Sequence, residues 1–378
     1  MNSRKIYLRR SFLIWLLALV LLWGFRFIPL DITDFVGNAN KIPTEPYDLY
    51  AQYEANSSVS ELDNRIVIIN IPDYANRNDI ATYLEELAMC NPSVVGLDFI
   101  FPEHKDSIAD NRLAEAINTF DDKIVVASFY NGERMMRSFF ADNINGYEGC
   151  INADVESKYD VIRTFMPLME IDGEIESSLA YLVGSLYTNK RETEHIKPNE
   201  RAYIYWKSVK FPIVDAEDIF SDKEKIEKKI VLVGSLNQED VHRTSISSDY
   251  NGVKVLAHSI RNIIDGDFIY YNPLLNNVLC GLILLLSSFI IQFFECNGDE
   301  RYSECTSLVS FLMQILLLIG VVIFGGYKLY QLGIYVDFTM LLLGILVYPI
   351  INDSYNVGKR FIEGVIRQIL KLKKIRLK

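Results

Sequence analysis

The chain has 378 residues, half of them hydrophobic, and a formal net charge of −11. Residues 31–273 carry 42 acidic and 23 basic residues, whereas residues 1–30 and 274–378 are net basic. An acidic central region argues against nucleic-acid binding, because phosphates are recognised by basic surface. Five cysteines without paired spacing and four scattered histidines argue against a disulfide framework and a zinc site, so we expect no metal and no cofactor. A Cys90–Cys150 disulfide is left open.

Residues 1–30 are predicted to anchor the chain in a membrane. The run Phe12–Leu30, interrupted by Arg26, has 19 residues, which is enough to cross about 30 Å of hydrocarbon. A cleaved signal peptide is the alternative, but no small-x-small cleavage site directly follows the run. Four basic residues precede the run and are expected to stay in the cytoplasm, which places the N-terminus inside.

The central region begins with a polar stretch, residues 31–63, that we interpret as an extended lead-in. After it, strand and helix patterns alternate. The predicted strands are Arg65–Ile71, Val94–Phe101 and Ile124–Ser128, and the predicted helices are Asp79–Cys90 and a segment capped by Asp110. Strands that alternate with helices at these spacings indicate right-handed crossovers and a parallel sheet.

The second half of the central region is less regular. Residues 129–170 are expected to form an insertion or an antiparallel edge. Further predicted elements are a helix at Ile175–Tyr187, a strand at Ala202–Trp206, a helix at Asp215–Glu227, a strand at Lys229–Ser235, and a strand end or turn running into a helix within Gly252–Gly266. The predicted fold class is therefore α/β, with a mainly parallel, three-layer extracytoplasmic domain over residues 31–273.

Polar side chains follow several predicted strands, at the edge where open parallel sheets bind ligands. They are Asp73, Asp98, Ser128, Ser235 and Asp240. One interpretation is a cleft that binds a small ligand or a divalent ion, since hard cations prefer carboxylates. The other is structural: Asp73 and Asp240 cap turns and helices, and Asp98 is a buried carboxylate satisfied by backbone N–H groups. The sequence leaves both interpretations open.

The patterns that identify common enzymes are mostly absent. No glycine-rich phosphate loop follows the first strand. Asp98 has no second aspartate two residues on, and Ser235 has no glycine two residues later, which argues against a phosphoaspartyl transferase and a nucleophile elbow. A triad of Asp240, His242 and His258 is not favoured. We predict no catalytic residues and no enzymatic activity.

The order of these segments resembles the type 2 CHASE family, the extracellular sensory domains associated with cyclases and histidine kinases. The matching pieces are RIVIINIPD, VVGLDFIFPE, DNRLAEAI, IVVAS, KIVLVGSLNQED and GVKVLAHSIRNIIDG, which lie in order within residues 60–270. The resemblance implies a sensory role without catalysis in this domain. One departure is visible: the family commonly has a histidine before the alanine of the last motif, where this chain has Leu256 and Ala257, with His258 one place later.

Residues 274–351 are predicted to form three further membrane spans, for four in total. The apolar runs are Leu274–Phe294, Leu308–Phe324 and Ile334–Ile351. Counting from an inside N-terminus places residues 31–273 outside and the tail, residues 352–378, inside. The tail carries eight basic and two acidic residues, in agreement with the positive-inside rule. Its apolar residues recur at helical spacing, which fits an amphipathic helix on the anionic inner leaflet, a helix that docks a partner, or a solvated positive anchor.

These features predict a multi-pass sensor of the bacterial inner membrane that detects an unidentified small ligand or an envelope protein. The chain ends 27 residues after its last predicted span, too few for a catalytic domain, so the signal is expected to pass to a separate cytoplasmic or membrane signalling protein. The alternative is a structural or assembly scaffold that binds another envelope protein constantly. Contact with membrane lipid is expected, and homo-oligomerisation is left open.

Overall fold

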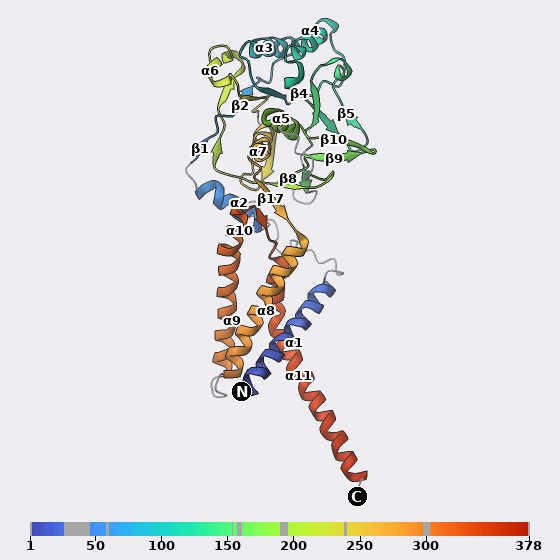
Figure 1. Cartoon of the computed structure of the whole chain (residues 1–378), viewed down its shortest axis with the longest axis vertical. Coiled ribbons are helices and arrows are strands. Elements are labelled where there is room, and N and C mark those ends of the chain that lie inside the picture. The colour runs from blue at the N-terminus through green and yellow to red at the C-terminus, as the bar shows by residue number, and fades with distance from the viewer. Residues whose placement is uncertain are drawn as a thin grey trace. The chain divides into compact units, whose positions relative to one another are not determined.

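The computed structural model describes residues 2–25, 46–57, 60–152, 154–156, 161–189, 196–237, 240–297 and 303–376 (Figure 1). The chain divides into two compact units. Tyr47–Tyr270 form the first, which we call the α/β unit, and Met1–Pro46 together with Tyr271–Lys378 form the second, which we call the helical unit. The helical unit is thus made from both ends of the chain.

The α/β unit contains a sheet whose parallel strands follow the order β13-β2-β14-β3-β4-β6. The late strand β14 lies at its centre, where Leu232 pairs with Ile68 on one side and with Gly96 on the other. The parallel sheet predicted from the sequence is therefore confirmed. The strands are β2 (Ile66–Asn70), β3 (Val94–Leu97), β4 (Ile124–Tyr130), β6 (Tyr147–Cys150), β13 (Ile213–Asp215) and β14 (Ile230–Gly234), with β5 (Met135–Met136) antiparallel to β4.

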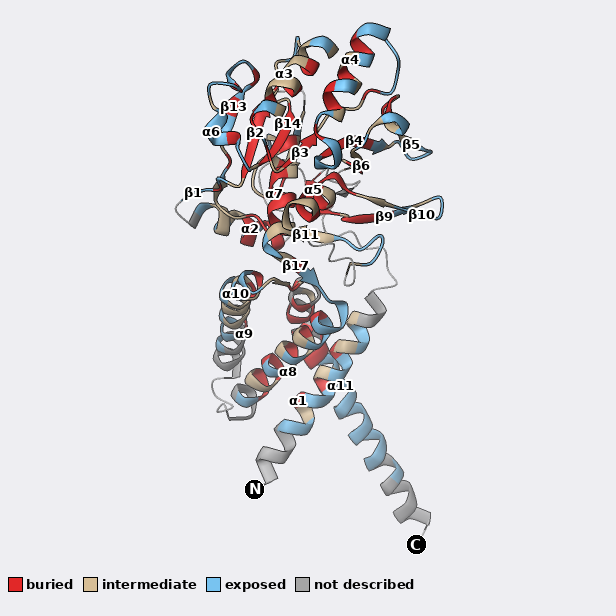
Figure 2. Ribbon diagram, turned by 45° about the horizontal axis from the view of Figure 1, so that its top comes forward, coloured by how far each residue is buried: buried red, intermediate tan, exposed pale blue. Residues whose placement is uncertain are grey.

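Helices cover both faces of this sheet, and its central strands are buried (Figure 2). On one face, α3 (Arg77–Met89) and α4 (Ser107–Asn118) pack against alternate residues of the strands, such as Val67 and Ile69. On the other face, α5 (Leu179–Thr188) and α7 (Gly252–Asp265) pack against the intervening residues, such as Ile68. Because side chains alternate along a strand, both faces are apolar and three layers form.

Gly149 in β6 allows α5 to approach the sheet closely. A Cβ atom at this position would lie 2.5 Å from the Cα atom of Leu179, so the strand or the helix backbone would have to shift. We expect Gly149→Ala to lower the free energy of unfolding by about 1–3 kcal/mol, measured by denaturant unfolding of the full-length protein. Gly281→Ala is the control, because a Cβ atom there meets nothing within 4 Å. Equal stability of the two variants would contradict this packing.

A second sheet of the α/β unit has the strand order β16-β15-β8-β11-β17. β15 is parallel to β8, and the other pairs along this path are antiparallel. The bounds are β8 (Val161–Phe165), β11 (Ala202–Ile204), β15 (Val241–Thr244), β16 (Tyr250–Asn251) and β17 (Phe268–Tyr271), and β7 (Asp154–Glu156) also pairs with β8. The predicted strand at Ala202–Trp206 belongs to this sheet and not to the parallel one.

Shorter elements complete the unit. β9 (Leu168–Ile171) and β10 (Glu174–Ser177) form a hairpin whose turn residues, Asp172 and Gly173, both have positive φ angles of 55° and 85°. That is the conformation for which Asp-Gly is favoured in two-residue hairpin turns. The remaining elements are β1 (Glu61–Leu62), which pairs with β12 (Val209–Lys210), the short helices η2 (Asp121–Lys123), η3 (Ala141–Asn143) and η4 (Ala216–Asp218), and α6 (Lys223–Ile226).

The predicted extended lead-in is wrong over residues 46–57, because α2 (Pro46–Ser57) is a helix, whereas Glu61–Leu62 form the short strand β1. α2 is held to β8 by an ion pair between Asp48 and Arg163, whose side chains are both almost fully buried. The Arg163 guanidinium donates two hydrogen bonds of 2.9 Å, from Nε and Nη2, to the two oxygens of the Asp48 carboxylate. Residues 26–45 lie outside the described part of the chain.

Several other predicted boundaries differ in the structure. α4 is capped by Asp106, whose side chain accepts a hydrogen bond from the Ile108 N–H. Asp110, predicted as the cap, lies instead inside the first turn and pairs with Arg77. α5 begins at Leu179, because the residues before it belong to the hairpin. The single helix predicted at 215–227 is divided into η4 and α6.

The predicted helix at the end of the unit is confirmed as α7, which ends at Gly266 with a φ angle of 66°. Left-handed backbone of this kind favours glycine and ends helices. Cys90 and Cys150 are free and buried, so the disulfide left open by the sequence is not formed.

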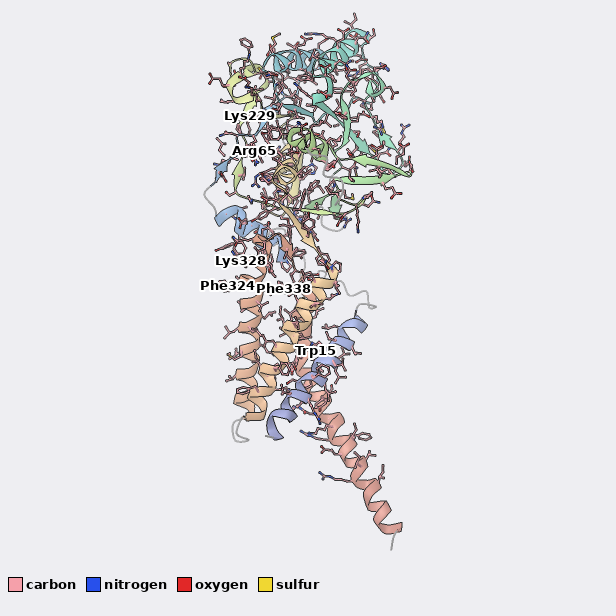
Figure 3. The ribbon with its side chains drawn as sticks, in the orientation of Figure 1. Trp15, Arg65, Lys229, Phe324, Lys328 and Phe338 are labelled. Carbon is pink, nitrogen blue, oxygen red and sulfur yellow. The ribbon has the colours of Figure 1, made fainter. Side chains whose placement is uncertain are left out.

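The helical unit consists of α1 (Asn2–Phe25), α8 (Pro273–Asn297), α9 (Ser303–Gly320), the π-helical η6 (Val321–Gly326), α10 (Tyr327–Gln331), the short strand β18 (Ile334–Tyr335) and α11 (Thr339–Arg376). α1 packs against α8 and α11. Trp15, labelled in Figure 3, donates a 2.9 Å hydrogen bond from Nε1 to the Gly281 carbonyl of α8. Phe338 is buried in the same apolar core.

Two of the helices meet the length and hydropathy of a membrane span within the described residues, at Pro273–Phe293 and Leu312–Gln331. Only 11% of the second segment is buried, and large apolar side chains such as Leu316 and Phe324 are more than half exposed. Apolar surface on this scale is unfavourable in water, so it indicates a membrane protein.

The prediction of four spans is not supported in full, because within the part of the chain that the structure describes only these two segments qualify. α1 is helical over the first predicted span as far as Phe25, and α11 is helical over the fourth only from Thr339, because Ile334 and Tyr335 form β18. In α1, only 15 residues, Ser11–Phe25, follow the basic residue Arg10. In α11, only 14 residues, Thr339–Asn352, precede the acidic residue Asp353. Both stretches are shorter than the roughly 20 apolar residues that cross a bilayer. Residues 26–30, which extend the first run, lie outside the described part.

Candidate functional site

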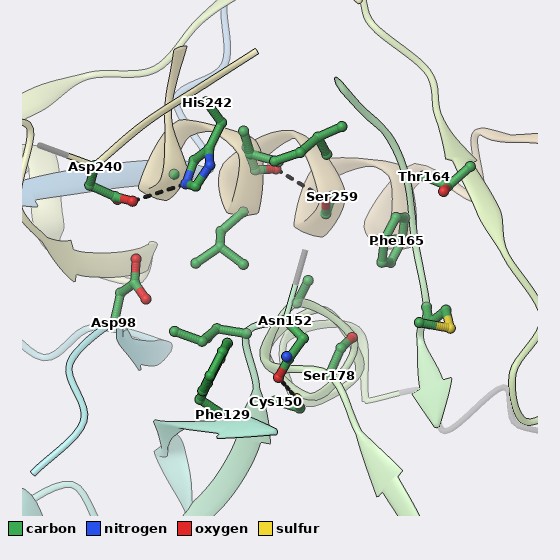
Figure 4. A pocket seen from close by; sticks show the side chains of 17 residues that line it. Asp98, Phe129, Cys150, Asn152, Thr164, Phe165, Ser178, Asp240, His242 and Ser259 are labelled. Atoms are coloured by element: carbon green, nitrogen blue, oxygen red, sulfur yellow. Dashed lines mark hydrogen bonds and ion pairs between the residues drawn. The ribbon is translucent and has the colours of Figure 1, made fainter. Parts of the chain in front are cut away.

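The α/β unit contains a cavity of about 490 Å³, shown in Figure 4. The parallel sheet contributes residues at or just beyond the carboxyl ends of three strands: Asp98 after β3, Phe129 in β4 and Cys150 in β6. α7 contributes Val255, Leu256 and Ser259, and β8 of the second sheet contributes Ile162, Thr164 and Phe165. The cavity thus lies at the edge of the sheet where α/β proteins usually bind ligands. We call it the edge cavity.

Three titratable side chains, those of Asp98, Asp240 and His242, lie together at one end of the edge cavity (Figure 4). His242 Nε2 lies 3.0 Å from Asp240 Oδ1. Asp240 also adjoins the first residue of α7, because the Gly252 N–H donates a 3.1 Å hydrogen bond to its backbone carbonyl. Gly252 leaves room for the Asp240 carboxylate, since a Cβ atom at this position would lie 2.5 Å from Asp240 Oδ2 and the carboxylate would have to move.

Asp98 is anchored through its backbone rather than its carboxylate. Its N–H donates a 2.8 Å hydrogen bond to the Val233 carbonyl, which continues the pairing of β3 with β14. Within the described part of the chain, no side-chain hydrogen bond or ion pair of Asp98 is present. The backbone N–H groups that the structural interpretation assigns to this carboxylate are therefore not found among the described residues.

At this end of the edge cavity, the pKa values of Asp98 and His242 are shifted from those of the same groups in water. Burial raises the pKa of Asp98 to about 7, the negative charge of Asp240 adds to this increase, and His242 opposes it. The pKa of His242 is also raised, mainly by its hydrogen bond to Asp240, while partial burial acts in the opposite direction. Asp98 therefore titrates near neutral pH, and its charge depends on its two neighbours.

The remainder of the edge cavity is mainly apolar. Phe129, Phe165 and Met166 supply large side chains. Its polar groups are largely engaged with the protein: Ser259 Oγ donates to the Val255 carbonyl at 3.0 Å, and Cys150 Sγ donates to Asn152 Oδ1 at 2.8 Å. An apolar cavity with a few convergent polar groups is the usual form of a small-molecule site.

The structure brings together only part of the site predicted from the sequence. Asp98 and Asp240 line the edge cavity, whereas Asp73, Ser128 and Ser235 do not. Ser235 Oγ donates a 2.9 Å hydrogen bond to Asp73 Oδ1, so these two residues form a local pair beyond the ends of β14 and β2. Ser128 is buried, and its Oγ has no hydrogen-bond partner within the described residues.

His242 also belongs to the group of side chains at the edge cavity, although the sequence indicates it only as a member of a triad that is not favoured. It lies two residues after Asp240, a spacing that places both side chains on the same side of an extended segment. His258 lies elsewhere: it is buried between the rings of Trp206 and Phe211, and its Nε2 is 2.9 Å from the Tyr250 hydroxyl. Burial lowers the pKa of His258 to about 3, so it is neutral. Leu256, at the position where the resembled family commonly has histidine, lines the edge cavity.

A metal centre is not indicated by the described residues. No group of three or more His, Cys, Asp or Glu side chains among them is arranged to hold a metal ion. Divalent cations bound through oxygen ligands take several carboxylates or carbonyls at once. The divalent-cation interpretation of Asp98 and Asp240 therefore gains no support from this geometry.

Comparisons with known proteins agree with the fold. The model of the CHASE2 domain matches residues 15–291, which include the parallel sheet, α7 and the lining of the edge cavity. A 64-residue segment is 34% identical to the virion membrane protein A14 homolog of Fowlpox virus (strain NVSL), covering 16% of this chain and 70% of that protein. No solved structure matches the chain significantly. Because the family model spans most of the sequence, the chain belongs to the CHASE2 domain family, a family of sensory domains.

Proposed function

We propose that this protein is a membrane sensor whose α/β unit binds a small molecule in the edge cavity. The observation that carries the proposal is the placement of Asp98, Asp240 and His242 in an otherwise apolar cavity of about 490 Å³, at the carboxyl edge of the parallel sheet. That volume lies within the range of small-molecule sites. In this proposal the unit binds its ligand without chemical turnover.

The membrane topology is part of the proposal. The protein would lie in the bacterial inner membrane, with residues 31–273 extracytoplasmic and the tail at 352–378 cytoplasmic. The excess of basic residues in the tail supports this orientation, because such residues are retained on the cytoplasmic side.

The route of the signal follows from the order of the chain. α7 supplies part of the cavity wall, and residues 266–272 connect it to α8, one of the two segments suited to span a membrane. A ligand that favours one position of α7 would bias the segment that follows it, in proportion to its difference in affinity for the two states. The receiver would be a separate cytoplasmic or membrane signalling protein.

The test is to identify the small molecules that remain bound to the full-length protein after purification in mild detergent. Leu256→Trp should strongly reduce their retention, because the larger side chain projects into the space that the ligand would occupy. Ile108→Trp is the matched control, since Ile108 is 78% exposed on α4. Equal retention by the two variants would contradict the proposal. If Leu256→Trp loses no compound, and an envelope protein is bound at constant stoichiometry through residues 31–273, the scaffold alternative is favoured.

A further inference from the structure

The charge of the edge cavity selects among ligands. Among the described residues, its lining contains two carboxylates, Asp98 and Asp240, and one imidazole, His242, but no lysine or arginine. Anionic ligands such as phosphates and carboxylates are normally bound by lysine, arginine or clustered N–H donors. The charge of this lining therefore favours a cationic ligand.

The hydrogen-bonding capacity of the lining points the same way. Ser259, Cys150 and Asn152 direct their donors to protein acceptors, namely the Val255 carbonyl, Asn152 Oδ1 and the Tyr130 carbonyl. The Asp98 carboxylate, in contrast, has two acceptor oxygens and makes no hydrogen bond within the described part of the chain. A ligand that donates hydrogen bonds satisfies this arrangement, because an unpaired carboxylate in an apolar cavity is costly.

The apolar residues of the lining indicate that the uncharged part of the ligand is apolar. Figure 4 shows Phe165 on the far side of the cavity from Asp98, and the apolar side chains of Phe129, Ile162, Met166 and Leu256 also line the cavity. A bare metal ion would leave this apolar volume unused, and no group of described residues is arranged as a metal site. An organic cation with an apolar body places its charge at the Asp98 end of the cavity and its apolar part against the apolar lining.

We propose that the edge cavity binds a small protonated amine with an apolar body, its ammonium group donating hydrogen bonds to Asp98 and Asp240. This inference rests on the proposed sensor function and specifies the chemical class of its ligand. Asp98 supplies the open acceptors, and Asp240, held by His242 and α7, supplies a second negative charge beside them.

The experiment measures binding to the full-length protein in nanodiscs by isothermal titration calorimetry at pH 8. The probes are butylamine, 2-phenylethylamine and tryptamine, each compared with the alcohol that replaces its ammonium group by a hydroxyl, and with 3-phenylpropionate as an anion. At least one amine should bind about tenfold or more tightly than its alcohol, since a charge-assisted hydrogen bond contributes this much. Asp98→Asn and Asp240→Asn should each weaken that amine by about tenfold, whereas Asp73→Asn, outside the cavity, should leave it unchanged.

The inference would be overturned by no saturable binding of any of the amines, by equal binding of amine and alcohol, or by tighter binding of 3-phenylpropionate. These outcomes are separable from failure of the sensor function. If the purified protein retains a neutral or anionic compound that Leu256→Trp loses, the cavity is a ligand site and only the amine assignment fails. If Asp73→Asn weakens binding as strongly as Asp98→Asn, the effect is general and the assignment also fails.

Discussion

Replacing Asp48 with alanine is expected to lower the free energy of unfolding by about 3–5 kcal/mol. Asp48 in α2 and Arg163 in β8 are 3% and 1% exposed, and two hydrogen bonds of 2.9 Å join them. Removing one partner of a buried ion pair leaves the other charge in a poorly solvating environment, which strongly destabilises the folded state. Asp48→Asn should lie between alanine and the native residue.

The measurement is denaturant unfolding of the full-length protein in nanodiscs, followed by the fluorescence of Trp206. The chain has three tryptophans, so replacing Trp15 and Trp23 with phenylalanine leaves Trp206, which is fully buried in the α/β unit, as the reporter. Glu85→Ala is the control, because Glu85 and Arg112 form an ion pair at 2.8 Å with both side chains about 40% exposed. Exposed pairs contribute about 0–1 kcal/mol.

The double variant Asp48→Leu with Arg163→Met separates charge burial from packing. It should cost less than Asp48→Ala alone, because replacing both members of a buried pair by apolar residues avoids an isolated charge. If Asp48→Ala costs no more than Glu85→Ala, α2 does not depend on this pair. If the double variant is the least stable, the pair contributes net stability that apolar packing cannot replace.

The parallel sheet could be predicted because its strands carry their own signal. Each of β2, β3, β4 and β14 is an apolar run of four to seven residues buried on both faces, and turn residues separate these runs from the helices. The order of the strands could not be predicted in the same way. β14 lies between β2 and β3 through pairing of residues more than 130 positions apart, and a local pattern contains no information about such partners.

The elements that were missed have weak local signals. α2 has little apolar periodicity along its sequence, and the Asp48–Arg163 pair that joins it to β8 links residues more than 100 positions apart. The β9–β10 hairpin was assigned in part to a helix, although its Asp-Gly turn is a recognised hairpin signal. Apart from the strand predicted at Ala202–Trp206, the second sheet consists of strands of two to five residues, most of which are too short for a period of two to be visible.

The site was predicted in outline from one rule, that polar residues at the carboxyl ends of parallel strands meet at one edge. Asp98 and Asp240, which the rule selects, line the edge cavity, but the rule also includes Asp73 and Ser235, which bond to each other instead. The other wall of the cavity comes from β8 and α7, and the contribution of β8 depends on the unpredicted second sheet. The composition of the cavity, and hence the class of its ligand, therefore required the structure.

Replacing Asp98 with asparagine is expected to stabilise the protein at pH 8 while removing its ligand. The raised pKa of Asp98, about 7, means that the folded state binds this proton more tightly than the unfolded state, where the value is about 3.9. Stability from this group is therefore fully present below about pH 4 and is lost as the pH rises to about 7. The pKa of His242 is also raised, so its contribution to the stability of the protein is likewise lost as the pH rises. An ionised Asp98 without a ligand is thus a source of instability that asparagine avoids.

Thermal unfolding of the full-length protein, followed by Trp206 fluorescence from pH 4 to pH 8, measures this effect. Asp98→Asn should raise the melting temperature at pH 8 by about 5 °C, which corresponds to about 2 kcal/mol in a unit of this size, and the gain should vanish toward pH 4. Asp73→Asn is the control and should show no such pH dependence, since Asp73 lies outside the edge cavity. A loss of stability at pH 8 would instead identify Asp98 as the structural carboxylate of the alternative interpretation. A gain would indicate that Asp98 is a destabilising charge at a position where a bound amine neutralises it, so that its energetic cost is recovered only when the ligand binds.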